Sequence, residues 1–286
     1  MMRYYRFADI AFEVDGLPEK LPDGKYLNLF RTASVVPDIT LHVQNTTLVL
    51  PSDAVRSGNI CYVEREGKHR IYGWFRTPNP AISFVLNDWK NAEITVDVHP
   101  ELYDDAAFTA NWLLSLSGFS TGLLYRKCAT LHCSYILVEN QAILFAGFSG
   151  MGKSTQAELW RRYRNAEIIN GDRALIFQRE DGWYAGGISA CGSSKICRNY
   201  TAKIAAVILL EKGSDNRVFP MKIAEKYRAL LTGMAFHRWK EEEIDTAGNL
   251  AMDILSELPM YRLRNRADEE SVEVIEKEIG GTLYDI

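Results

Sequence analysis

A glycine-rich segment carries the clearest chemical signal in this sequence. Residues 147–154 match the pattern G-x-x-x-x-G-K-[ST]. The glycines let the backbone curl so that successive amides point inward at phosphate oxygens, and a helix beginning near Lys153 adds the positive end of its dipole. The pattern predicts that Lys153 reaches the β- and γ-phosphates of a nucleoside triphosphate and that the Ser154 hydroxyl binds Mg²⁺. The residues assigned to binding the nucleotide are Gly147, Phe148, Ser149, Gly150, Met151, Gly152, Lys153, Ser154 and Thr155.

The sequence on either side of this segment suits a phosphate-binding loop. Residues 141–146 are mostly apolar and predict a strand that runs directly into the loop. After the loop, Ala157, Trp160 and Tyr163 recur at helical spacing and predict one buried helix face. Strand, glycine-rich loop and helix in this order form the setting that the phosphate chemistry requires.

A carboxylate for the metal ion is expected at the end of a neighbouring strand. Residues 167–169 predict a strand, and Asp172 follows shortly after, directly before Arg173 and another apolar strand. At this place a carboxylate can hold Mg²⁺, or it can orient and deprotonate an attacking hydroxyl. The alternative is a strand-end turn in which Asp172 only caps backbone amides.

A loop of small and polar residues is predicted between two apolar strands, over residues 186–199. Such a loop can approach phosphates or a peptide closely, and its cations can neutralise transferred charge. An ordinary flexible connection explains the same composition. The candidate contacts to substrate or phosphate are Arg173, Ser193, Ser194, Lys195 and Arg198.

Taken together, these motifs resemble a known family. The segment Leu131–Cys133, the glycine-rich loop and residues 170–173 are similar to the catalytic domain of HPr kinase/phosphorylase, and more closely to HPr-kinase-like proteins associated with ribosomal-peptide maturation. The resemblance covers about residues 126–200, and the rest of the C-terminal half more loosely. It implies the P-loop fold shared with phosphoenolpyruvate carboxykinase, with a mixed sheet, and phosphoryl transfer to a serine hydroxyl. It also implies a catalytic role near the γ-phosphate for His132, for which a structural role in a strand is the alternative.

The chain differs from that family at identifiable positions. Ser154-Thr155 stands where HPr kinases have Ser-Glu, and Gly171 occupies the place of a second acid beside Asp172. The glycine-rich arginine signature that follows in HPr kinases is also missing from the sequence. These differences argue against HPr itself as the acceptor and against the reverse phosphorolysis.

The preferred functional hypothesis is an Mg-ATP-dependent kinase that transfers the γ-phosphate to a serine hydroxyl of a peptide or small protein. Lys153, the loop amides and Mg²⁺ held by Ser154 and Asp172 would position the phosphates and neutralise their charge. Two alternatives stay open: a small-molecule (metabolite) kinase on the same scaffold, and a catalytically inactive nucleotide-binding interaction module, which Gly171 favours. The sequence lacks an N-K-x-D guanine-recognition element, but it does not settle ATP against GTP.

Hydrophobic patterning divides the chain into two parts. Residues 1–103 predict a β-rich N-terminal domain, and docking of the substrate is one interpretation of its presence. Residues 104–286 are expected to form the α/β P-loop domain. The expected strands of the first part cover residues 4–14, 40–50, 60–64, 69–75 and 81–98. The expected helices cover residues 104–125, 221–234, 246–258 and 269–279.

Composition narrows the class of protein. The 286 residues are 47% apolar and 24% charged with a net charge of −4, which is typical of a soluble globular protein and gives no basic face for nucleic acid. Five cysteines without a C-x-x-C pair argue against a disulfide scaffold or a zinc site. No apolar run reaches the ~18 residues of a membrane helix, and the charged residues near Met1 predict no signal peptide. We expect a cytoplasmic protein without nucleic-acid or membrane partners; the family resemblance is compatible with a homo-oligomer.

Overall fold

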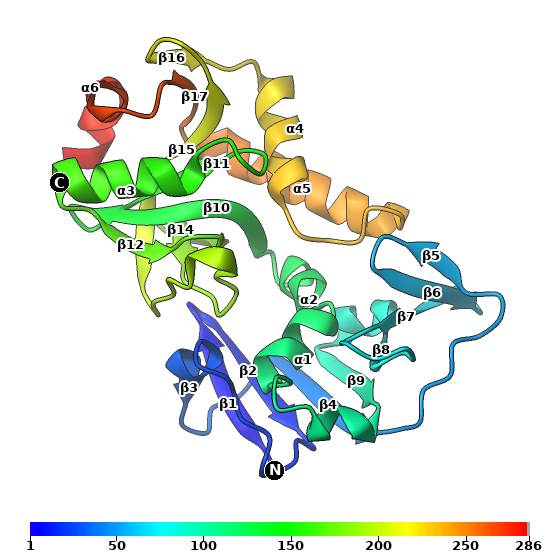
Figure 1. Cartoon of the computed structure of the whole chain (residues 1–286). Helices are drawn as coiled ribbons and strands as arrows, with labels where there is room; N and C mark the ends of the chain where they lie inside the picture. The colour runs from blue at the N-terminus through cyan, green and yellow to red at the C-terminus, as the bar shows by residue number, and fades with distance from the viewer. Residues whose placement is uncertain (285–286) are drawn as a thin grey trace. The chain divides into compact units, whose positions relative to one another are not determined.

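The chain divides after Tyr125 in the computed structural model, which describes residues 1–284 (Figure 1). The N-terminal unit therefore extends beyond the boundary predicted after residue 103 and includes helices α1 (Ala110–Leu116) and α2 (Phe119–Tyr125). These helices belong to it because they pack on its sheet. The ring of Phe119 contacts the rings of Phe7, Phe12 and Trp89.

The single helix predicted over residues 104–125 is wrong. Residues 100–104 form a 3-10 turn, and the helical part is split into α1 and α2. The break falls at Gly118, whose φ of 72° lies in the left-handed region that glycine adopts without steric cost. A second glycine, Gly122, allows α2 to approach the indole of Trp89, since a Cβ there would lie 2.1 Å from the ring.

The N-terminal unit is built on one nine-stranded sheet. Its strand order is β3-β1-β2-β4-β9-β8-β7-β6-β5, and β4 lies parallel to both β2 and β9, so the sheet is mixed. The strands are β1 (Arg3–Phe7), β2 (Ile10–Asp15), β3 (Arg31–Thr32), β4 (Ile39–Asn45), β5 (Val55–Ser57), β6 (Ile60–Arg65), β7 (Lys68–Gly73), β8 (Ile82–Val85) and β9 (Glu93–Val98).

Two of the long strands predicted in this unit are each divided. Residues 4–14 form the hairpin β1–β2, which turns at Ala8 with a φ of 49°. Residues 81–98 form β8 and β9 with a 3-10 helix, Leu86–Asn91, between them. The β-branched and aromatic composition predicted extended chain correctly, but it did not predict where the chain reverses.

The C-terminal unit contains a mixed sheet with the pairing order β11-β10-β13-β14-β15-β17-β16, while β12 pairs with β10. A parallel pairing between β11 and β15 joins the ends of the first five strands into a closed circuit. The strands are β10 (Ala129–Val138), β11 (Gln141–Ala146), β12 (Glu167–Asn170), β13 (Arg173–Arg179), β14 (Gly182–Gly186), β15 (Thr201–Lys212), β16 (Arg217–Pro220) and β17 (Met260–Asn265). The α/β class and the mixed sheet agree with the sequence prediction.

Helices cover this sheet on both faces. Helices α3 (Lys153–Arg164) and α6 (Glu269–Tyr284) share one core with β10, β11 and β15, in which Trp160 and Phe145 are fully buried. Helices α4 (Ile223–Gly233) and α5 (Glu241–Glu257) pack against each other and against β10 and β14 (Figure 1). The strand that leads into the glycine-rich loop thus lies inside a three-layer arrangement that fixes its position.

Part of the C-terminal third differs from the sequence prediction. The three expected helices are present, although α5 begins earlier than residue 246, at Glu241. The segment between α5 and α6 forms the strand β17, and β16 pairs beside it. Within Met260–Asn265, the buried Leu263 lies between the half-buried Arg262 and Arg264, an apolar and basic alternation that is typical of a half-buried strand and was not recognised in a region expected to be helical.

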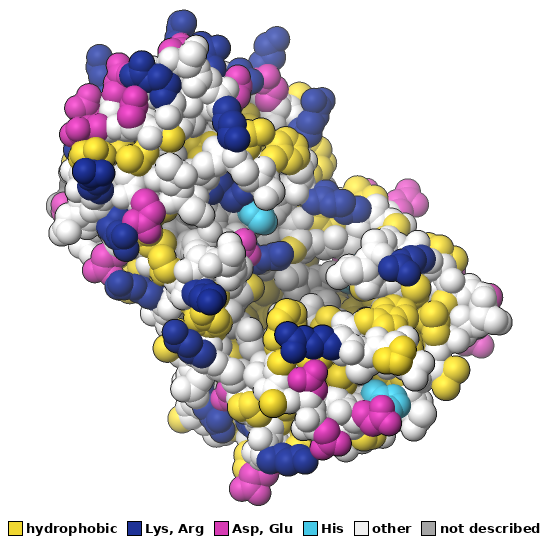
Figure 2. Space-filling view, in the orientation of Figure 1, with side chains coloured by type: hydrophobic (Ala, Val, Ile, Leu, Met, Phe, Trp, Pro, Cys, Tyr) yellow, Lys and Arg dark blue, Asp and Glu magenta, His cyan; other side chains and the backbone are white. Residues whose placement is uncertain are grey.

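Charged side chains of both signs are interspersed over the surface of the C-terminal unit that Figure 2 shows. This agrees with the nearly balanced totals of 33 Lys and Arg against 37 Asp and Glu. Over residues 1–284, no helix has both the length and the apolar character needed to cross a membrane.

Candidate active site

The glycine-rich loop connects β11 to α3, as the sequence predicts. Gly147, Gly150 and Gly152 have φ values of 142°, 79° and 95°, a region that residues with a Cβ rarely adopt. Gly152 is the residue before the first turn of α3, so the amides at the start of this helix are available to a ligand. Ser154 and Thr155 are exposed in that first turn. The loop therefore has the backbone shape and the helix terminus that phosphate binding needs.

The side chain of Lys153 lies along the loop. Its ammonium donates hydrogen bonds to the carbonyl oxygens of Gly147, at 2.9 Å, and Phe148, at 3.2 Å. The residue is only 7% exposed, and this burial lowers the pKa of the ammonium, while the nearby carboxylate of Asp172 raises it. A buried cation is thus held at the beginning of the loop, close to a carboxylate.

Asp172 lies in a turn that is held by hydrogen bonds to the side chain of Asn170. The Asn170 side chain is fully buried, and its Oδ1 accepts hydrogen bonds from the backbone N–H groups of Asp172, at 2.9 Å, and Arg173, at 3.0 Å. Its Nδ2 donates to the carbonyl oxygens of Ile188 and Ala190, at 2.9 and 3.1 Å. The amide nitrogen of Asn170 thus donates two hydrogen bonds and its oxygen accepts two, and together they join the Asp172 turn to the loop after β14. The sequence motif contains Asn170, but its pattern gave no indication of this function.

His132 lies beside Asp172. Strand β10 pairs with β13 so that His132 is opposite Arg173, and the Nε2 atom of His132 is 3.8 Å from Oδ1 of Asp172. Burial and the charge of Lys153 lower the pKa of His132, and Asp172 opposes this. This lowered pKa favours the neutral imidazole at pH 7, in which one ring nitrogen donates a hydrogen bond and the other accepts one.

The turn of Asp172 is covered by the 3-10 helix η4, Gly192–Ser194. A Cβ at Gly171 would lie 2.3 Å from the Oγ of Ser194, and a Cβ at Gly192 would lie 2.7 Å from the Cγ of Asp172. Ser194 in turn donates to the carbonyl oxygen of Cys191, at 2.7 Å. The predicted loop 186–199 is thus packed closely on the carboxylate turn.

The remaining predicted contacts are distributed unevenly around this turn. Arg173 lies next to Asp172, with Nε 3.3 Å from Oδ2. Ser193 and Lys195 are exposed on η4 and at its end. Arg198 forms an ion pair with Glu167, at the opposite end of β12 from Asp172. The structure therefore brings Lys153, Asp172, His132, Arg173 and Ser194 together, but it places the guanidinium of Arg198 elsewhere.

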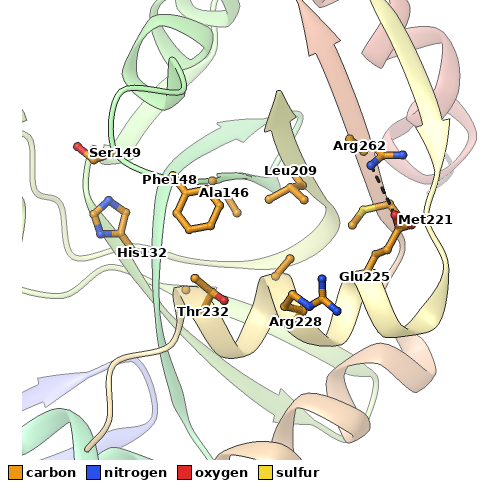
Figure 3. Close-up of a pocket in the computed structure, with 13 residues that line it drawn as sticks. His132, Ala146, Phe148, Ser149, Leu209, Met221, Glu225, Arg228, Thr232 and Arg262 are labelled. Carbon is orange, nitrogen blue, oxygen red and sulfur yellow. Dashed lines mark ion pairs between the residues drawn. The ribbon is translucent and has the colours of Figure 1, made fainter. Parts of the chain in front are cut away.

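A pocket of about 320 Å³ adjoins this group of residues. One side is formed by His132 and the first loop residues, from Gly147 to Ser149, and the opposite side by α4 with Arg228 and Thr232 (Figure 3). The sequence did not predict this pocket, because α4 begins only at Ile223, far along the chain from the loop, and shows no local sign of facing it.

Comparison with known proteins adds little to this geometry. No protein-family model matches the sequence, and no curated protein matches it either. Among solved structures, the chain is similar to the Hpr(Ser) kinase/phosphatase from Coxiella burnetii, with 12% sequence identity and a TM-score of 0.30, over 52% of this chain and 95% of the other. This TM-score is too low to support a conclusion, so the function is inferred from the residues of the site.

Proposed function

We propose that the C-terminal unit is an Mg-ATP-dependent kinase that transfers the γ-phosphate to a hydroxyl group, of which a serine in a peptide or small protein is the preferred candidate. The observation that carries the proposal is the convergence, beside the end of β11, of a buried loop cation, Lys153, with Asp172 and His132. The three side chains come from α3, β10 and the turn before β13. Phosphoryl transfer requires little more from a protein than such positioning and charge neutralisation.

The residues present suit this chemistry in a defined way. The hydroxyl oxygen of the acceptor forms a bond to the γ-phosphorus, the bond to the bridging oxygen of ADP breaks, and the hydroxyl proton passes to a base. Asp172 is the proposed base or metal ligand, and neutral His132 is the proposed hydrogen-bonding partner of the transferred group. Lys153 and the amides of the loop stabilise the negative charge.

The side chains also fit a magnesium ion that is shared with the phosphates. Among the residues that the structure describes, no group of three or more His, Cys, Asp and Glu side chains forms a ready metal cage. Mg²⁺ in nucleotide sites is held by one or two protein oxygens together with phosphates and waters. Asp172 and the exposed hydroxyl of Ser154 would supply these protein oxygens, and the ion would add charge stabilisation at the phosphates.

A catalytically inactive nucleotide-binding module is the second candidate, and one observation favours it. A side chain at position 171 has no space because Ser194 occupies it, so the site is limited to one carboxylate, Asp172, on this turn.

Thermal unfolding with and without Mg-ATP, combined with release of phosphate, separates the two candidates. Ligand at a hundredfold excess over its Kd stabilises the folded protein by about 2.7 kcal/mol, which raises the midpoint of a unit of this size by roughly 5 to 10 °C. The variants are Lys153→Ala and Asp172→Asn, with Lys203→Ala as a control for the loss of an exposed lysine on β15.

For a kinase, wild type and Lys203→Ala shift with Mg-ATP, Lys153→Ala does not, and slow phosphate release requires Asp172. Equal binding without release in wild type and Asp172→Asn would identify the inactive module. If no nucleotide shifts the wild-type midpoint, the proposal is wrong.

A further inference from the structure

The pocket beside the loop lies at the end where phosphate transfer would occur. Gly147 and Phe148, whose carbonyl oxygens accept from the Lys153 ammonium, both line it, and so does His132. Ser154 and Thr155, in the first turn of α3, do not line it. Of the groups expected at the transferred phosphate, His132 and the loop residues Gly147 and Phe148 border this space, while Lys153 and Asp172 lie behind them, and a molecule in the pocket would face the first three.

The pocket has apolar walls with cations at one side. Leu209, Met221 and the 67%-exposed ring of Phe148 provide apolar surface, and Figure 3 shows that ring directed into the space. Such a combination suits a small or extended ligand with an apolar body and one charged group, because the walls bury the body and a few polar groups orient it.

Among residues 1–284, one of the two arginines that line the pocket has no ionic partner. Arg262 lies 3.6 Å from Glu225 and 3.7 Å from Glu211, so its charge is already matched. The carboxylate of Glu225 also accepts from the N–H of Lys222, at 3.0 Å. Arg228, on the same side of α4, forms no ion pair or hydrogen bond with any residue in the range 1–284.

We propose, on the basis of the kinase function above, that this pocket binds the phosphate acceptor and that Arg228 recognises a carboxylate carried by that acceptor. A guanidinium binds a carboxylate through two parallel hydrogen bonds, which fixes the direction of the ligand as well as its position. With the carboxylate on α4, the opposite end of the acceptor points toward His132 and the loop, where its hydroxyl would meet the phosphate. The carboxylate can be an acidic side chain of a peptide or the free carboxylate of a small molecule.

Binding of matched probes tests this inference without knowledge of the natural acceptor. N-acetyl-L-serine carries the hydroxyl and a free carboxylate, and N-acetyl-L-serinamide carries the hydroxyl alone. The blocked peptide acetyl-Glu-Ser-amide has its carboxylate on a side chain. Ligand-observed NMR gives the Kd of each probe for wild type, Arg228→Gln and Lys226→Gln, and the Kd of Mg-ATP is measured in the same proteins. Lys226 is a matched control because it is a cation of α4 that does not line the pocket.

In wild type we expect at least one carboxylate probe to bind about tenfold more tightly than the serinamide. Tighter binding of N-acetyl-L-serine would indicate the free carboxylate of a small molecule, and tighter binding of acetyl-Glu-Ser-amide would indicate an acidic side chain of a peptide. Arg228→Gln removes the preference and Lys226→Gln retains it, while the Kd of Mg-ATP is unchanged in both variants.

Three results would overturn the inference: no preference in wild type, a preference that survives Arg228→Gln, or weaker Mg-ATP binding in Arg228→Gln, which would assign the pocket to the nucleotide. Failure of wild type to bind Mg-ATP is a different outcome. It rejects the kinase function. The two failures can be told apart because the probe measurements need no nucleotide.

Discussion

Ser194 occupies the space into which a side chain at position 171 would project, since a Cβ on Gly171 would lie 2.3 Å from its Oγ and 2.4 Å from its Cβ. The family pattern that the sequence resembles has an acid at this position. In this chain Gly171 is accompanied by the close packing of η4 on the turn. The single carboxylate of the site is therefore a consequence of local packing as well as of one residue type.

The packing of Gly171 against Ser194 gives a prediction about stability. Gly171→Ala forces the two residues apart and lowers the free energy of unfolding by about 2 kcal/mol, which is typical of overpacking. Adding Ser194→Gly removes both clashing atoms and restores most of the loss, because the nearest remaining atom, the Cα of Ser194, is 3.9 Å away. Urea denaturation of the two single variants and the double variant measures this coupling. Additive effects would show that the two residues do not compete for the space.

Replacing Asn170 by Asp is predicted to lower the free energy of unfolding. In Asn170→Asp, an oxygen replaces the Nδ2 that donates to the carbonyls of Ile188 and Ala190. Two donated bonds become two repulsive contacts in a fully buried place, so we expect a loss of about 3 kcal/mol at pH 7.5. Because protonation of the new carboxyl restores one donor, the loss decreases at pH 5. Circular-dichroism melts at both pH values check this, and an equal loss at the two would contradict it.

His237 makes stability depend on pH. Burial, with a smaller contribution from the charge of Lys240, lowers the pKa of His237 from 6.5 to about 4. Above pH 6.5 the group is neutral in both the folded and the unfolded chain, and it has no effect there. As the pH falls toward 4, only the unfolded chain binds the proton, so wild type loses up to about 3 kcal/mol from this residue.

His237→Gln should remove that component. Denaturation between pH 7.5 and pH 4 measures the free energy of unfolding of both proteins, and the curve of the variant is expected to be flatter by about the same amount. Parallel curves would show that His237 titrates normally in the folded protein.

The N-terminal unit contains a buried ionic cluster around Asp23. Its carboxylate accepts hydrogen bonds from Arg3 and Tyr5, each at 2.7 Å, and from Arg31 at 2.9 Å. Asp23→Asn leaves the buried guanidinium of Arg3 without an anion, so we expect a loss of about 3 kcal/mol or more. Asp53→Asn is the control, because its pair with Arg65 is exposed and removal costs at most about 1 kcal/mol. Hydrogen exchange of strands β1 and β2 follows both changes, and similar effects would contradict the distinction.

The sequence predicted the elements whose cause is local. The strand over residues 141–146 and the helix after Gly152 agree with the structure, because glycine spacing and apolar periodicity act within a few residues. Asp172 was expected after a neighbouring strand, and His132 was expected near the loop only from the family resemblance; their proximity to each other is a finding of the structure. Nucleotide binding itself stays a proposal.

The features that the sequence did not predict depend on distant partners. The hydrogen bonds of Asn170 to Ile188 and Ala190 require the loop after β14 to fold back onto the Asp172 turn. The residues near position 170 contain no pattern that predicts this. The position of Arg228 opposite the loop depends on how α4 packs on β10. Arg198 was included as a cation of a flexible loop, and its pairing with Glu167 follows from β-bridge contacts near Asn170 that composition cannot reveal.

The closed circuit of strands has a consequence for synthesis of the chain. The strand that carries the loop is flanked by β10, which precedes it, and by β15, where Gln141 is aligned with Lys203. On the ribosome, β11 lacks this parallel neighbour until residues 201–212 have left the exit tunnel, and such long-range pairings form slowly. In a nascent chain the glycine-rich loop therefore reaches its final position only after most of the unit has been translated, and any ligand of this loop can assist only the last stage of folding.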